Sequence, residues 1–139
     1  MSVSVNKRPP LQIRLDPHSG VPVYRQIIDQ VTGGIAVGAL HGGDQLPTVR
    51  QLAVDLSINP NTVIRAYREL EIRGMLDTEQ GTGTFVSHQR VQRDDADRQR
   101  KLTQLVGEFA ARAGSAGFTV EELLEGLQEI QGDAKKKTR

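Results

Sequence analysis

The sequence predicts a mainly α-helical fold with one small β-hairpin. Apolar residues recur at the i, i+3, i+4, i+7 spacing of amphipathic helices in five segments. One pair of β-prone runs flanks a glycine-containing tip at residues 80–83, which is a hairpin signal. With 139 residues, the chain allows either one ordinary domain or one small domain plus an appendage. With 4% aromatic residues and no Trp, its core must consist of Leu, Ile, Val and Ala.

The first helix is expected to follow an irregular N-terminal segment. Residues 11–15 alternate apolar and polar side chains, which predicts either a short strand or an extended lead-in, and residues 16–20 form a turn. Pro22 suits the first turn of a helix, where its missing N–H costs nothing. Gly38 and the glycine pair 42–43 end this helix. Its apolar stripe is Tyr24, Ile27, Ile28, Val31 and Ile35.

A second, shorter helix is predicted to begin after Thr48. Thr48 is a good N-cap, and Gln51 three residues later can complete a capping box. The buried side of this helix is Val49, Leu52, Ala53 and Leu56. Residues 57–58 then make a tight turn.

A third helix follows the turn at once. Asn59 is its expected N-cap with Pro60 at the first helical position, and Ile58 and Val63 are spaced as a hydrophobic staple. Val63, Ala66, Tyr67 and Leu70 form the apolar stripe. Gly74 ends the helix, and the hairpin of residues 75–86 begins directly behind it.

The remaining residues predict two amphipathic helices. Residues 87–98 are polar and charged and form either a linker or the solvated start of a helix. Glycines within 114–117 separate the two helices, and Thr119 with Glu122 marks the start of the last one. The expected apolar positions are Leu102, Leu105, Val106, Phe109, Ala110 and Ala113 in one helix, and Val120, Leu123, Leu124, Leu127 and Ile130 in the other.

Three helices, the last two joined by a tight turn and followed by a hairpin, make a winged helix-turn-helix. In that motif the second helix of the pair lies in the DNA major groove. Its non-packing side here presents Asn59, Asn61, Thr62, Arg65 and Arg68. Asn reads adenine, and Arg reads guanine or holds a phosphate. The expected division is a flexible N-terminus at 1–10, a winged helix-turn-helix domain at 11–88, and a helical tail with a basic end at 89–139.

Three motifs resemble the GntR family of bacterial regulators. Residues 43–53, GDQLPTVRQLA, resemble its G-x-x-L-P-[ST]-x-R-x-L-A signature. Residues 59–71, NPNTVIRAYRELE, resemble its recognition helix, in the form found in the YtrA and MocR branches. Residues 81–86, GTGTFV, resemble its G-x-G-T-[FY]-V wing. The motifs occur in the family's order and spacing.

The resemblance implies roles for particular residues. Arg50 corresponds to an arginine that contacts the operator, and Thr48 caps its helix and can reach a phosphate. The wing tip, which enters the minor groove in the family, is Gln80, Gly81 and Thr82. The recognition helix contacts DNA through Asn59, Asn61, Thr62 and either or both of Arg65 and Arg68, and which of the two arginines touches a base stays open.

The tail of about fifty residues is too short for a sensor or aminotransferase domain, and resembles the two-helix dimerisation element of the YtrA subfamily. The expected dimerisation residues are Leu102, Leu105, Val106, Phe109, Leu123, Leu124, Leu127 and Ile130. The resemblance implies a homodimer that binds an inverted-repeat operator of double-stranded DNA. Repression of transcription is expected, and the resemblance to the YtrA subfamily implies a transporter operon and the regulator's own gene as targets.

Other function classes are weaker. His18, His41 and His88 are scattered, there is no Cys, and the 81–83 tip is too short for a phosphate-binding loop, so no enzyme, metal or cofactor is expected. A net charge of +1 leaves open a winged helix that contacts protein or RNA instead of DNA. No signal peptide or membrane span is visible, which predicts a cytoplasmic protein. No residues argue for a small-molecule effector.

Overall fold

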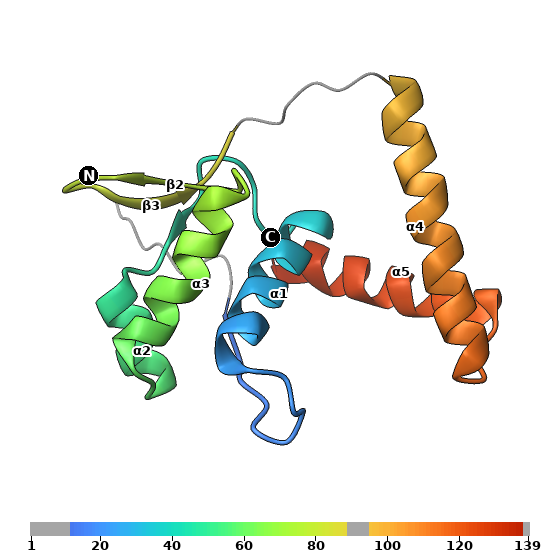
Figure 1. The fold of residues 1–139 in the computed structure, drawn as a ribbon, viewed down its shortest axis with the longest axis horizontal. Coiled ribbons are helices and arrows are strands. Elements are labelled where there is room, and N and C mark those ends of the chain that lie inside the picture. Colours follow the sequence, from blue (N-terminus) through green and yellow to red (C-terminus); the bar gives the residue numbers. More distant parts are fainter. Residues whose placement is uncertain (1–11, 89–94, 138–139) are drawn as a thin grey trace. The chain divides into compact units, whose positions relative to one another are not determined.

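The computed structural model describes residues 12–88 and 95–137, which divide into two compact units (Figure 1). The first unit contains α1 (Val23–Ala36), β1 (Gln45–Leu46), α2 (Val49–Leu56), α3 (Pro60–Ile72), β2 (Leu76–Glu79) and β3 (Gly83–Val86). The second contains α4 (Asp95–Ser115) and α5 (Val120–Lys137) as far as Asp133. The mainly helical fold with a small antiparallel wing is therefore confirmed. The predicted flexible N-terminus, 1–10, lies outside the described residues, and the domain boundary at 88/89 stays a prediction.

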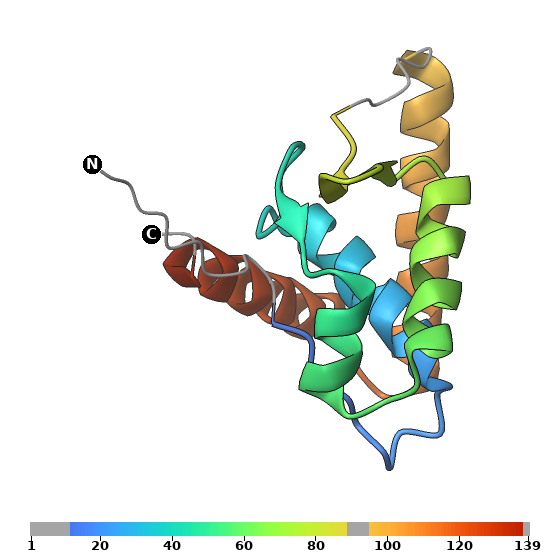
Figure 2. The ribbon, with the colours of Figure 1, turned by 90° about the vertical axis from the view of Figure 1, so that its left-hand side faces the viewer.

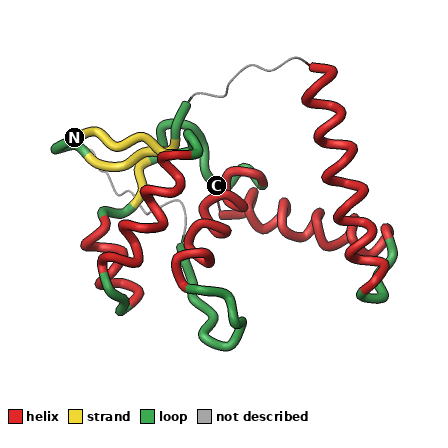
Figure 3. Tube along the Cα trace, viewed as in Figure 1, coloured by secondary structure: helices red, strands yellow, loops and turns green. Residues whose placement is uncertain are grey.

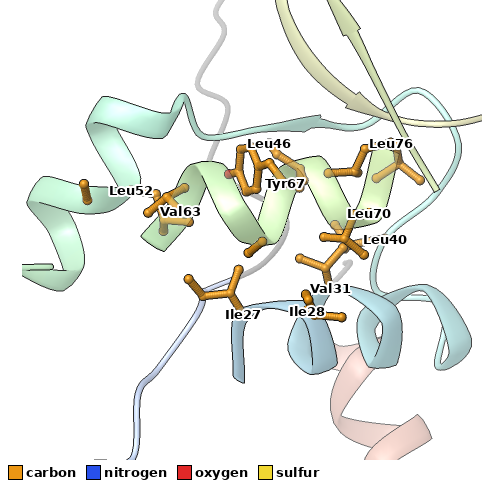
Figure 4. Packing of buried hydrophobic residues seen from close by; sticks show 13 residues of the cluster. Ile27, Ile28, Val31, Leu40, Leu46, Leu52, Val63, Tyr67, Leu70 and Leu76 are labelled. Carbon is orange, nitrogen blue, oxygen red and sulfur yellow. The ribbon is translucent and has the colours of Figure 1, made fainter. Parts of the chain in front are cut away.

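Helix α3 is the centre of the first unit. It packs against α1 and α2, with the sheet at its C-terminal end and α2 at its N-terminal end (Figures 1 and 2). Leu70 lies on the side of α3 that faces α1, and Tyr67 lies on the side that faces β1 (Figure 4). The predicted stripe of Val63, Ala66, Tyr67 and Leu70 is fully buried. The other buried hydrophobic residues of this core are Ile27, Ile28, Val31, Leu40, Leu46, Leu52, Ala53, Leu76 and Val86.

The wing is part of a three-stranded antiparallel sheet with the order β1-β3-β2. In β2–β3, Leu76 pairs with Val86 and Glu79 with Gly83, which confirms the predicted hairpin. The sequence reading missed β1, whose Gln45 pairs with Phe85. A two-residue strand has no alternation to detect, and it exists only because β3 supplies its hydrogen-bond partners.

Two tight turns set the directions of α3 and the wing. Ser57, between α2 and α3, has a left-handed φ of 55°, and the Ile58 N–H donates to the Ala53 carbonyl at 3.0 Å. At the end of α3 the Met75 N–H donates to the Leu70 carbonyl at 2.9 Å, as in a Schellman motif. Gly74 makes this motif possible with a φ of 76°. The predicted helix stop thus also aims the chain into β2.

The chain before α1 is extended but forms no strand, so the strand alternative for residues 11–15 is wrong over the described residues 12–15. Its backbone pairs with a side chain instead. The Arg14 N–H donates to Gln30 Oε1 at 2.9 Å, and Gln30 Nε2 donates to the Arg14 carbonyl at 2.7 Å. The side-chain amide of Gln30 satisfies both the N–H and the carbonyl of Arg14. The alternating segment therefore stays extended without a neighbouring strand.

The second unit consists of two helices that diverge from the turn between them (Figures 1 and 3). Helix α4 begins at Asp95, so the described end of the 87–98 segment is helical, and residues 89–94 lie outside the description. The predicted capping box is present: the Thr119 N–H donates to Glu122 Oε1 at 3.0 Å, and the Glu122 N–H donates to Thr119 Oγ1 at 3.2 Å. None of the helices within the described ranges has the length and apolarity needed to cross a membrane.

Candidate DNA-binding interface

The N-terminus of α2 presents an exposed arginine on a fixed first turn. Thr48 caps the helix, because its Oγ1 accepts from the Gln51 N–H at 3.0 Å. This is the Thr48 half of the predicted capping box. Arg50 is the second residue of α2, and its side chain is exposed. The cap therefore holds the backbone that carries Arg50 while the guanidinium remains accessible.

A buried tyrosine joins α3 to the start of α2. The Tyr67 hydroxyl donates to the Pro47 carbonyl at 2.7 Å, one residue before the Thr48 cap. Tyr67 is 4% exposed, and burial raises the pKa of its hydroxyl above the usual value. Sequence analysis assigned Tyr67 to the core only. The hydrogen bond to Pro47 fixes the loop that leads to Arg50. The only sequence signal for this hydrogen bond was that Tyr67 is an amphipathic side chain at a core position.

Helix α3 turns a polar face away from the core. Asn59 caps the helix by accepting from the Asn61 N–H at 2.8 Å, so the predicted cap is confirmed. Asn61, Arg65 and Arg68 are exposed at the i, i+4, i+7 spacing of one helix face. Thr62 is half-buried at the side of this face. Asn59 is exposed, but its side-chain oxygen is engaged in the cap.

The arginines of this surface have no acidic partner among the described residues. The ion pairs recorded there are His41–Asp44, Arg73–Glu69, Arg100–Asp97 and Lys101–Asp97. The charge of Arg73, the C-cap of α3, is thus neutralised by Glu69. The charges of Arg50, Arg65 and Arg68 are not neutralised in this way. The guanidinium of Arg65 instead lies over the Tyr24 ring of α1, 3.7 Å from its centroid. Tyr24 was assigned to the core stripe from the sequence, and this contact was not predicted.

The wing tip is exposed and is held from two sides. Gln80, Gly81 and Thr82 are all exposed at the β2–β3 turn, where the Thr82 N–H donates to the Glu79 carbonyl at 2.9 Å. Gln45 of β1 donates from Nε2 to the Thr82 carbonyl at 3.3 Å. Sequence analysis gave Gln45 no role, because its partner is 37 residues away.

Strand β2 of the wing is hydrogen-bonded to α3. Thr78 of β2 donates a hydrogen bond from its hydroxyl to the Glu71 carboxylate of α3. The Thr78 and Thr84 hydroxyls lie 3.3 Å apart across the hairpin. These contacts and the α2 cap place the predicted DNA residues of α2, α3 and the wing on one packed unit.

The predicted dimerisation residues lie in the second unit with much of their surface accessible. Leu102, Leu105, Val106, Phe109, Leu124, Leu127 and Ile130 are each between 49% and 62% exposed, and Leu123 is half-buried. Within residues 95–133, only Ala113 is buried. Two diverging helices cannot cover each other's apolar stripes, so both stripes are left accessible.

Known proteins match both the motif region and most of the chain. The family described as "Bacterial regulatory proteins, gntR family" matches residues 23–86. The HTH-type transcriptional repressor YtrA of Bacillus subtilis (strain 168) is 37% identical over 88% of this chain and 95% of its own length. The chain therefore belongs to the GntR family, whose members are transcription regulators and not enzymes.

Two solved structures extend the likeness. YtrA from Sulfolobus acidocaldarius, titled a GntR-family transcription factor, has 31% identity and a TM-score of 0.55 over 72% of this chain and 97% of its own. A chain from Listeria monocytogenes EGD-e titled a transcriptional antiterminator has 26% identity and a TM-score of 0.66, over 88% of this chain and 92% of its own. The protein is thus a DNA-binding transcription regulator of the GntR type, similar to the YtrA proteins over most of its length.

Proposed function

We propose that this regulator represses transcription as a homodimer that binds an inverted-repeat operator through its winged helix-turn-helix. The observation that carries this proposal is the group of three exposed arginines, Arg50, Arg65 and Arg68, that lack an acidic partner among the described residues. The three side chains stand on the two helices of one helix-turn-helix, and a group of exposed positive charges on such a unit suits an anionic ligand. DNA supplies it as phosphates, and arginine can also read guanine.

In this arrangement α3 lies in the major groove. Asn61, exposed in the first turn, is placed to meet base edges, and Arg50 of α2 approaches the same groove from its side. Thr48 and Asn59 cap α2 and α3, and Thr62 lies at the side of the polar face. These three residues are placed to meet the sugar-phosphate backbone of the DNA. The wing tip, made of Gln80, Gly81 and Thr82, reaches the adjacent minor groove. Gly81 has a left-handed φ of 79° and no side chain, so the backbone of the tip can approach the DNA closely.

The dimer is formed by the second unit. Its accessible leucines and Phe109 lie on two helices, and a second copy of the same helices supplies a matching apolar surface. A two-fold axis then relates two copies of α3, spaced by about 34 Å or a multiple of it, which calls for an inverted-repeat operator. Repression follows when the dimer occupies a promoter and excludes the polymerase.

The YtrA likeness suggests the targets. The Bacillus subtilis relative is named a repressor, and the YtrA subfamily resemblance points to a transporter operon and the regulator's own gene. The region upstream of the gene for this protein is therefore the first DNA to examine.

The test is selection of bound sites from a pool of random DNA duplexes, followed by fluorescence anisotropy. We expect an enriched inverted repeat that also occurs upstream of the gene. Binding at about 0.15 M salt should be on the order of a thousandfold tighter than to a scrambled duplex. Tighter binding to an RNA of the same sequence would favour an RNA-reading winged helix, and no binding even at low salt would favour a protein partner. Either result would refute the proposal.

A further inference from the structure

The ring of Tyr24 on α1 lies directly beneath the guanidinium of Arg65 on α3. The Arg65 Cζ atom is 3.7 Å from the ring centroid, which is contact distance for a cation over an aromatic face. Tyr24 is half-buried and packs against the core of the first unit, so its ring has a fixed position. Arg65 is exposed. The contact therefore favours one orientation of a side chain with four rotatable bonds before any ligand arrives.

This contact draws Arg65 to one flank of α3. At about 100° per residue, Asn61 and Arg68 lie within about 20° of each other around the helix axis. Arg65 lies about 40–60° away from them, toward α1. When a helix fills the major groove, the middle of its outer face meets the base edges and its flanks meet the sugar-phosphate backbones.

The chemistry of the stacked guanidinium suits a phosphate. The aromatic ring occupies only the flat face of the group, so the N–H donors at its edge remain available for hydrogen bonding. None of the ion pairs within residues 12–88 and 95–137 involves Arg65, so its positive charge is not neutralised by a neighbouring carboxylate there.

We propose that Tyr24 is a positioning residue that holds Arg65 against a DNA phosphate at the edge of the major groove, so that base reading by α3 falls to Asn61 and Arg68. The inference deepens the proposed function and rests on it. It also resolves the choice between Arg65 and Arg68 that the sequence leaves open.

A double-mutant cycle on the selected operator tests this assignment. Arg65→Gln should weaken binding equally for the operator and for its single-base-pair variants. It should also reduce the slope of log K against log salt by about 0.9 per half-site. Tyr24→Leu should weaken binding about two- to fivefold per half-site and should add no further loss to Arg65→Gln. Tyr24→Phe, which keeps the ring, should bind like the wild type.

Arg65→Lys provides a test that leaves the core unchanged. It keeps the charge but loses the planar stack, so we expect the wild-type salt slope with an affinity loss similar to that of Tyr24→Leu. Wild-type affinity in Arg65→Lys, additive losses in the cycle, or loss of discrimination at one base pair in Arg65→Gln would each overturn the inference. Thermal unfolding of every variant separates these effects from loss of folded protein.

The control arms separate this inference from the proposed function. If the wild type selects no DNA site, the proposed function and the inference fall together. If the wild type binds its operator and Arg50→Ala weakens that binding, but Tyr24 and Arg65 show no coupling, only the inference falls.

Discussion

The double substitution Leu105→Asp with Leu127→Asp should convert the proposed dimer into monomers. The two leucines are 62% and 51% exposed in the single chain. Fully burying a leucine stabilises a protein by about 1.5–3 kcal/mol, so covering the exposed parts contributes about 1.4 and about 1.1 kcal/mol at the midpoint of that range. A two-fold interface counts each side chain twice, which gives about 5 kcal/mol, or more than about a thousandfold in the dimer dissociation constant. The buried carboxylates add a further desolvation cost.

Sedimentation velocity over a range of protein concentrations measures this change. Ile72→Asp is the matched control, because Ile72 is 75% exposed in the first unit and lies outside the proposed interface. The control should remain a dimer. A double variant that sediments as a dimer at the same concentrations as the wild type would show that α4 and α5 do not form the interface. With dimerisation lost, operator affinity should fall as well, because the two half-sites would be bound independently.

The other predictions concern the winged helix-turn-helix. Arg50→Ala should weaken specific operator binding by about 1–3 kcal/mol in anisotropy titrations without lowering the melting temperature, and unchanged affinity would remove Arg50 from the interface. Tyr67→Phe deletes the hydrogen bond to the Pro47 carbonyl and should cost about 0.5–1.5 kcal/mol in urea denaturation at pH 7. Because burial raises the folded-state pKa of Tyr67, its protonated hydroxyl contributes stability that is present below the unfolded-state value of about 10 and is lost as pH rises above it. Wild-type stability should therefore fall more steeply above that pH than that of Tyr67→Phe, and parallel curves would contradict the assignment. Gly83→Ala should destabilise the wing by about 1–3 kcal/mol, because a φ of 140° is strained for a residue with a Cβ, and the new Cβ would also displace the Gln45 amide from the Thr82 carbonyl; an unchanged melting temperature would refute this.

Much of the fold was predictable because its signals are local. Thr48, Asn59 and Thr119 cap their helices as expected, since a cap needs only a side-chain oxygen and an N–H two or three residues later. The buried stripe of α3 follows from the 3.6-residue period of the helix. The hairpin follows from two β-prone runs and a glycine-containing tip. The family motifs added the prediction of which surface faces DNA, which periodicity does not supply.

The sequence also determined which side chains are candidates for the interface. It did not determine which distant residues a segment pairs with. The strand β1 forms only beside β3, and in the extended segment 12–15, where a strand was one expectation, the backbone of Arg14 pairs with the side chain of Gln30. Neither partner is marked by any pattern in the segment itself. Local propensity therefore left these two choices open, and packing decided them.

What only the tertiary structure decided is how the candidate arginines are held and whether their charges are compensated. The contact of Tyr24 with Arg65 joins α1 to α3, and the hydrogen bond of Tyr67 joins α3 to the loop before α2. Both span 20 or more residues of chain, so they exist only after three helices have packed. The sequence by itself determined the elements, their caps and their apolar faces, because each depends on neighbours within one or two turns. The positions of side chains from different elements depend on the packing of the whole unit, and that information is not contained in any short stretch of the chain.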